Sequence, residues 1–195
     1  MDGIGFLAAP AGSPQAQALL DEDREELGYV MNVTRLWSYQ PETVTALFDV
    51  MRKSLAEANL THRQRGVLVA AAASARGDAY CSLAWGQKLS DFASPEVAAG
   101  VITGDDAPLT DDERAMAAWA RRVVGDPNAV TTADVDAVRR AGFDDAQIFA
   151  MTTFIALRLA FSTVNDALGA APDVELCGTV PEQVLAAVTF GRHPA

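Results

Sequence analysis

The thiol of Cys81 lies at the start of a predicted helix, a position that can make a cysteine reactive. Cys81 follows Gly77, which ends one predicted helix, and falls in the first turn of the next. The positive end of a helix dipole favours a thiolate and lowers the pKa of a cysteine placed there. Because the thiolate is a nucleophile, Cys81 is the candidate catalytic residue. The alternative is a packing role, since free cysteines are among the most buried residue types.

Two neighbours in the sequence bear on that chemistry. Asp78 lies three residues earlier, and its negative charge would raise the pKa of the thiol. Trp85 lies four residues later and shares a helix face with Cys81. Its ring either fills space in the core, as large aromatic side chains do, or forms the wall of a small apolar pocket.

The remaining cysteine and the histidines indicate no cofactor. Cys177 lies in the tail beside Gly178 with no activating neighbour, so both cysteines are expected to be free thiols. With two cysteines and two histidines, none at ligand spacing, the sequence predicts no metal site. No glycine-rich phosphate loop is visible, so no organic cofactor is expected.

Several cationic side chains are expected to take no part in the chemistry. His62 is expected to be solvated at the start of a predicted helix. Arg63 and Arg65 either lie at the surface, as most arginines do, or face a pocket. Arg158 interrupts an apolar segment, where a buried charge must be paired. Carboxylates or helix-end carbonyls are its expected partners, rather than a substrate.

These residues are carried by a succession of predicted helices. Helix caps and breakers recur along the chain, and no stretch alternates long enough to indicate a strand. The segment 145–169 is apolar on nearly every face, so it is either a central helix or part of a subunit interface, and we expect a homo-oligomer, most simply a dimer. The predicted helices cover 14–26, 41–59, 61–76, 79–92, 95–103, 110–125, 132–142 and 145–169, with one or two turns after Pro181.

Length and composition exclude several classes of protein. The chain has 195 residues, 50% of them hydrophobic, which suffices for a single domain over 1–195 with its own core. A net charge of −11 opposes binding to nucleic acid or to anionic membrane surfaces. The longest uncharged apolar stretch ends at Arg158 and is too short to cross a bilayer. The first residues hold no cationic signal region, so we expect a cytoplasmic protein.

The segment 60–81, L-T-H-R-Q-R-G-V-L-V-A-A-A-A-S-A-R-G-D-A-Y-C, resembles the core helix and cysteine loop of the alkylhydroperoxidase D and carboxymuconolactone decarboxylase superfamily, especially its peroxidase-related branch. The resemblance implies an all-α, alkylhydroperoxidase D-like helical bundle that forms homo-oligomers, here with a lead-in over 1–27 and a tail over 173–195. Further segments resemble the family in order and spacing: 26–42, 109–120, 133–148, 167–173 and 188–192.

The resemblance also implies a chemistry that this chain has altered. Peroxidatic members use a Glu followed by C-x-x-C-x-x-x-H, in which the cysteines form a reducible disulfide and the Glu and His relay protons. Cys81 falls on the second cysteine, whereas Gly66, Asp78 and Trp85 stand where the Glu, the first cysteine and the His would be. A C-x-x-C disulfide cannot form. A one-cysteine cycle remains, in which Cys81 is oxidised to a sulfenic acid and rescued by an external thiol.

Three functions stay open at this point. The first is an antioxidant oxidoreductase in which Cys81 reduces or senses an organic hydroperoxide. The second is a non-redox enzyme of the same fold acting on a small carboxylated or lactone substrate. The third is a catalytically silent member that serves as a small-molecule-binding or structural oligomer. A buried sulfur without acidic or basic neighbours would favour the silent protein, and a sulfur at the foot of a pocket would favour chemistry.

Overall fold

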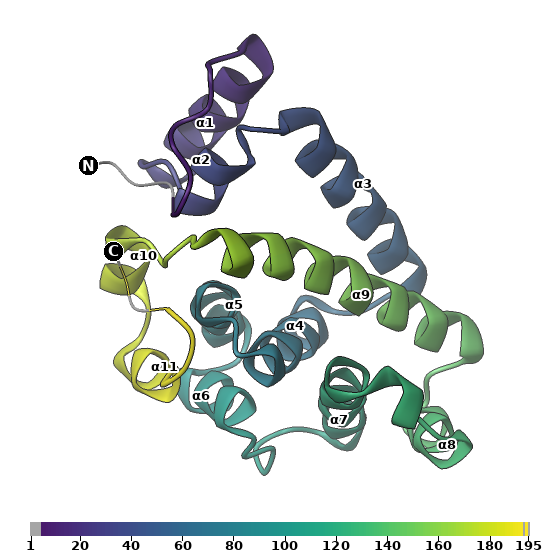
Figure 1. Cartoon of the computed structure of the whole chain (residues 1–195). Helices are drawn as coiled ribbons and strands as arrows, with labels where there is room; N and C mark the ends of the chain where they lie inside the picture. Colours follow the sequence, from purple (N-terminus) through teal and green to yellow (C-terminus); the bar gives the residue numbers. More distant parts are fainter. Residues whose placement is uncertain (1–4, 193, 195) are drawn as a thin grey trace.

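The predicted all-α fold is confirmed. The computed structural model describes residues 5–192 and 194, which form eleven α-helices, one 3-10 helix and no β-strand (Figure 1). The elements in chain order are α1 (Pro14–Leu27), α2 (Asn32–Trp37), α3 (Pro41–Ala58), α4 (His62–Arg76), α5 (Ala79–Phe92), α6 (Pro95–Thr103), α7 (Asp111–Gly125), η1 (Pro127–Ala129), α8 (Thr132–Arg140), α9 (Asp145–Leu168), α10 (Val174–Thr179) and α11 (Glu182–Ala187).

The helix boundaries follow the capping residues. Thr61 and Gln64 form a capping box at the start of α4, and Asp144 and Gln147 form another at the start of α9. Each box pairs backbone N–H groups that the first helical turn would leave unbonded. Two six-residue helices, α2 and α10, were not predicted, and neither has a side-chain hydrogen bond at its N-cap.

The centre of the molecule is α4, which contacts α5, α6, α7 and α9 (Figure 1). Every residue from Gly66 to Ala73 is buried. Four of them are the consecutive alanines 70–73, whose small side chains let the surrounding helices approach closely. The most central helix is therefore the alanine-rich α4 rather than the apolar α9.

The 24-residue helix α9 is long and apolar enough to cross a membrane by length and composition, with a mean hydropathy of 1.4 over its best window. It packs against α3, α4, α7 and α8 (Figure 1). Its buried face includes the polar residues Arg158, Ser162 and Asn165. These contacts are those of a helix that packs against the core, and its outer face leaves Phe149 exposed.

Candidate functional site

The start of α5 fixes the position of Cys81. Gly77 adopts the left-handed conformation with φ of 76° and ends α4. Asp78 is the N-cap of α5, and its Oδ1 accepts the backbone N–H of Cys81 at 2.8 Å. Cys81 therefore occupies the first turn of the helix, as predicted. Asp78, expected only as a charge beside the thiol, also holds the cysteine backbone in place.

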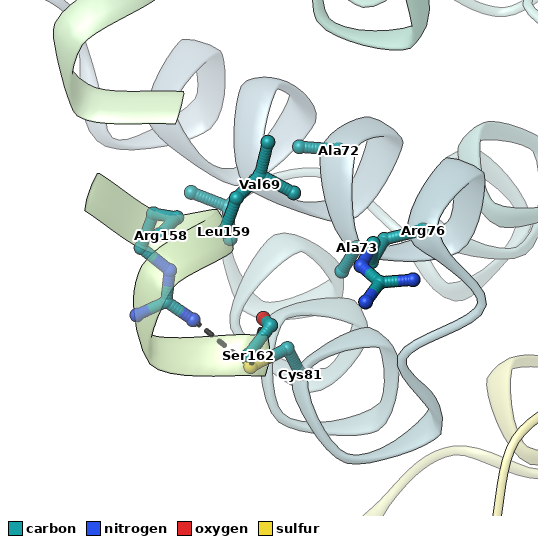
Figure 2. Close-up of a pocket in the computed structure, with 8 residues that line it drawn as sticks. All are labelled: Val69, Ala72, Ala73, Arg76, Cys81, Arg158, Leu159 and Ser162. Atoms are coloured by element: carbon teal, nitrogen blue, oxygen red, sulfur yellow. Dashed lines mark hydrogen bonds between the residues drawn. The ribbon is translucent and has the colours of Figure 1, made fainter. Parts of the chain in front are cut away.

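The sulfur atom contacts polar groups from α9. Cys81 is 3% exposed, and Arg158 Nη2 donates to its Sγ at 3.1 Å (Figure 2). Ser162 Oγ lies 3.8 Å from the same sulfur. Arg158 and Ser162 are four residues apart and so share one helix face. The sulfur is thus buried, but it has a cation and a hydroxyl group as direct neighbours.

The partners of Arg158 differ from the carboxylates or helix-end carbonyls that the sequence predicted. In the part of the chain that the structure describes, Arg158 forms no salt bridge and no hydrogen bond other than the one to Sγ. Its remaining close contacts are aromatic, with Cζ 5.5 Å from the Trp85 ring centre and 5.4 Å from that of Phe161. Arg158 as a whole is 8% exposed. A buried positive charge therefore faces the thiol.

Burial dominates the protonation of Cys81. Loss of solvent raises the pKa of the thiol to about 12, because the charged form is poorly solvated in the interior. Arg158 opposes this rise, and the negative charge of Asp78 adds to it. The expectation that the helix dipole lowers this pKa is wrong, since desolvation outweighs it. At neutral pH the resting side chain is a thiol.

One carboxylate oxygen of Asp78 has no hydrogen-bond donor in the part of the chain that the structure describes. The residue is fully buried, and its Oδ2 receives no hydrogen bond from any N–H or O–H group of the described residues. An unpaired buried acceptor is costly in free energy and is commonly a sign of function. This oxygen belongs to the one carboxylate that acts on the pKa of Cys81.

A small cavity opens beside the sulfur. Its volume is about 10 Å³, which holds roughly one water molecule. Trp85, for which a packing role and a pocket wall were both open, does not line this cavity. Eight residues of α4, α5 and α9 line it (Figure 2): Val69, Ala72, Ala73, Arg76, Cys81, Arg158, Leu159 and Ser162.

The position expected for the glutamate has been filled by packing. A Cβ atom on Gly66 would lie 3.1 Å from Cδ1 and 3.2 Å from Cβ of Leu89. These separations are shorter than ordinary van der Waals contact, so a glutamate could enter only if Leu89 moved. The apolar Leu89 side chain therefore lies where the glutamate would extend, and it cannot relay protons.

The other sequence candidates lie elsewhere. Cys177 is a free, partly buried cysteine in α10. His62 stacks on Phe92 with ring centres 5.0 Å apart, and His193 lies outside the described residues. Arg63 is paired with Glu113 at 2.6 Å. Within the described residues, no three His, Cys, Asp or Glu side chains are grouped so as to hold a metal ion.

Solved structures with the same architecture include two peroxidase-related proteins. One, from Ralstonia eutropha JMP134 and described as an alkylhydroperoxidase AhpD core, is 26% identical, with a TM-score of 0.76 over 93% of this chain and 100% of its own. The other, from Silicibacter sp. TM1040, is 22% identical, with a TM-score of 0.80 over 91% of this chain and 96% of its own.

The debrominase Bmp8 is also similar in structure. Its apo form is 15% identical, with a TM-score of 0.75 over 95% of this chain and 100% of its own. A Cys-to-Ala variant of Bmp8 in complex with 2,3,4-tribromopyrrole is 16% identical, with a TM-score of 0.73 over 91% of this chain and 97% of its own. No protein-family model and no curated protein matches the sequence. The chain has the alkylhydroperoxidase D-like fold that its core helix and cysteine loop predicted.

Proposed function

We propose that this protein is a cytoplasmic, thiol-dependent peroxidase in which Cys81 reduces a hydroperoxide. The observation that carries the proposal is the Arg158 guanidinium 3.1 Å from the buried Sγ, with no carboxylate partner in the described residues. A cysteine that only fills space does not need a buried cation beside it. When the thiol ionises, the thiolate and the guanidinium form a neutral pair, which compensates the buried charge.

The first half-reaction consumes one hydroperoxide. The thiol proton passes to the free carboxylate oxygen of Asp78, and Arg158 stabilises the thiolate. The thiolate attacks the terminal peroxide oxygen, so that an S–O bond forms and the O–O bond breaks. The leaving alkoxide takes a proton from Asp78 and departs as an alcohol. Cys81 is left as a sulfenic acid, oxidised by two electrons.

The second half-reaction needs two external thiols. Asp78 occupies the place of the resolving cysteine, so an outside thiol must attack the sulfenic acid. That attack releases water and leaves a mixed disulfide on Cys81. A second thiol then displaces the protein sulfur, and its proton restores the Cys81 thiol. The sum is one hydroperoxide and two thiols converted to an alcohol, water and a disulfide.

The cavity favours a narrow reacting group. A volume of about 10 Å³ accepts the end of a peroxide but not a polybrominated ring. The complex of the Bmp8 variant with 2,3,4-tribromopyrrole therefore supports a cysteine-centred site in this fold more than it supports dehalogenation here. A hydroperoxide would enter with its O–O group first, while the rest of the molecule stays outside this cavity.

The proposal is tested by measuring hydroperoxide consumption with a small external thiol. Wild type and Cys177→Ser should turn over at equal rates, and Cys81→Ser should give only the uncatalysed rate. Mass spectrometry with a sulfenic-acid trap should place the adduct on Cys81. Equal background rates for wild type and Cys81→Ser would exclude the peroxidase and favour a silent binding or structural protein.

We also propose that the protein is a homodimer. Phe149 is 75% exposed on the outer face of α9, and Val50 is 45% exposed on the neighbouring α3. The resemblance to an oligomeric family supports the same assembly here, and these exposed side chains are the ones that a partner subunit would cover. Sedimentation velocity at micromolar concentration should give about twice the mass of one chain. A monomer under these conditions would contradict the proposal.

A further inference from the structure

Three cationic side chains converge on the Trp85 ring. Arg65 of α4 places its Cζ 4.8 Å from the ring centre, and Lys88 of α5 places its Nζ at the same distance. Arg158 of α9 lies 5.5 Å away. This concentration of positive charge is exceptional in a chain whose net charge is −11.

No salt bridge neutralises the cluster within the described residues, although the charge of Glu26 acts on the pKa of Lys88 and opposes its lowering. Among the described residues, none of the three cations forms a salt bridge, although seven other arginines do. The Nε atom of Arg65 is buried without a hydrogen-bond partner. Burial and the charge of Arg158 lower the pKa of Arg65, and burial and both arginines lower that of Lys88. Like charges held together at this cost indicate an anion that is bound in the working protein.

A groove adjoins this cluster at Lys88, the one member of the cluster that lines it. It has a volume of about 450 Å³, within the size range of small-molecule sites. Phe161, the ring beneath Arg158, lines the same groove and stacks on Trp37 at 5.6 Å. The groove therefore has Lys88 and an aromatic stretch on its wall. Acidic residues of α1 line its other side: Glu22, Asp23 and Glu26.

We propose that Arg65, Lys88 and Arg158 bind the carboxylate of a small organic acid whose apolar tail lies in this groove. Guanidinium groups pair with carboxylates through two parallel hydrogen bonds, and the aromatic rings suit a hydrocarbon chain. A monoanion also loses less hydration at these rings than a doubly charged phosphate would.

The site deepens the proposed function, and this part of the inference rests on it. Arg158 contacts Sγ and the Trp85 cluster at once, so a carboxylate bound there lies one guanidinium group away from the thiol. One carboxylate neutralises one of the three positive charges, so positive charge remains at Arg158 beside the sulfur. The cavity at Cys81 and the groove share no lining residue, so the substrate class is a hydroperoxide whose O–O group lies close to its carboxylate and whose tail lies in the groove. Binding of the acid itself requires no turnover.

Calorimetry and thermal unfolding at constant ionic strength test the site. Octanoate should bind wild type saturably and raise its Tm, acetate should bind more weakly for lack of a tail, and neutral octanamide should have no effect. Arg65→Gln should weaken octanoate binding about 10- to 100-fold, the range for losing a charged hydrogen bond. Lys88→Gln should weaken binding in the same direction, whereas Lys53→Gln on the exposed face of α3 is the matched control and should bind as wild type does.

A second readout separates a binding role from a structural one. Without ligand, Arg65→Gln should unfold at a higher temperature than wild type, because it removes repulsion that no bound anion offsets. A lower Tm would assign Arg65 a structural role and overturn the proposal. Cys81→Ser should bind octanoate as wild type does, whether or not the protein consumes hydroperoxide.

Three other outcomes would overturn the proposal. Equal effects of octanoate and octanamide would remove the requirement for charge. Binding of inorganic phosphate but not octanoate would assign another ligand class. No octanoate binding, together with a dimer that dissociates in Arg65→Gln and Lys88→Gln, would show that acidic side chains of a second copy fill the site.

Discussion

Replacement of Arg158 by methionine separates its electrostatic role from its packing. Methionine keeps an unbranched apolar stem of similar reach but removes the charge 3.1 Å from Sγ. At an effective dielectric constant of about 20–25, two unit charges at that separation interact by roughly 4–5 kcal/mol. Since one pKa unit equals about 1.4 kcal/mol, the pKa of Cys81 should rise further in the variant and its thiolate should be about 10³-fold less populated.

The rate should fall by less than the thiolate population. The population drops about 10³-fold, but a more basic thiolate is a better nucleophile, with a Brønsted coefficient of about 0.4–0.5. The two effects together predict a roughly 50-fold slower reaction of Cys81 with peroxide. The variant should be at least as stable as wild type, because it removes a buried charge that no carboxylate pairs.

The assay is the second-order rate of sulfenic-acid formation at several peroxide concentrations, read by trapping and mass spectrometry. Urea unfolding of the same variants gives the stability. Arg158→Lys is the matched control, since it keeps the charge and should retain most of the rate. A methionine variant that reacts as fast as wild type would refute the electrostatic role, and one destabilised by more than about 2 kcal/mol would show that Arg158 is structural.

Three further results are expected. Asp78→Asn keeps the N-cap acceptor and should leave Tm nearly unchanged. If Asp78 carries the proton, the substitution should slow peroxide reduction at least about tenfold. A faster reaction would show that the charge of Asp78 only opposes the thiolate of Cys81. Gly66→Glu should destabilise the fold by about 1–3 kcal/mol in urea unfolding, through overpacking against Leu89, without raising activity. Burial and the charge of Asp78 raise the pKa of Asp166 to about 6. The stabilising contribution of protonated Asp166 is therefore present below the ordinary pKa of 3.8 and is lost as pH rises through 6. Asp166→Asn should raise Tm at pH 7 but not at pH 4, and equal shifts at both pH values would contradict this.

Local signals were enough to predict most helices, because each cap and breaker acts within one turn. Thr131, for example, caps α8 from the residue directly before it. The short helices α2 and α10 escaped prediction because no side chain caps them. Their six residues are held by tertiary contacts, such as the bond from Asn32 N–H to Asp173 Oδ1 across 141 residues of sequence.

The candidate site shows the same division. Cys81 could be identified from the Gly turn and helix start that precede it. Its partners Arg158 and Ser162 lie 77 and 81 residues away, and only the packing of α9 against α4 and α5 brings them to the sulfur. Helical spacing groups 81, 85 and 88 on one face and 158 and 162 on another, but it does not say that these faces meet. Nor could the dipole argument weigh the burial that sets the pKa of the thiol.

The cap made by Asp78 has a consequence for any attempt to build a two-cysteine site into this chain. Asp78→Cys would supply the second thiol, but it would also remove the acceptor that begins α5, at a cost of about 1 kcal/mol. The glutamate could not be added at Gly66 without moving Leu89. The helix start that places Cys81 and the spacing that a C-x-x-C disulfide needs therefore compete for the same residue.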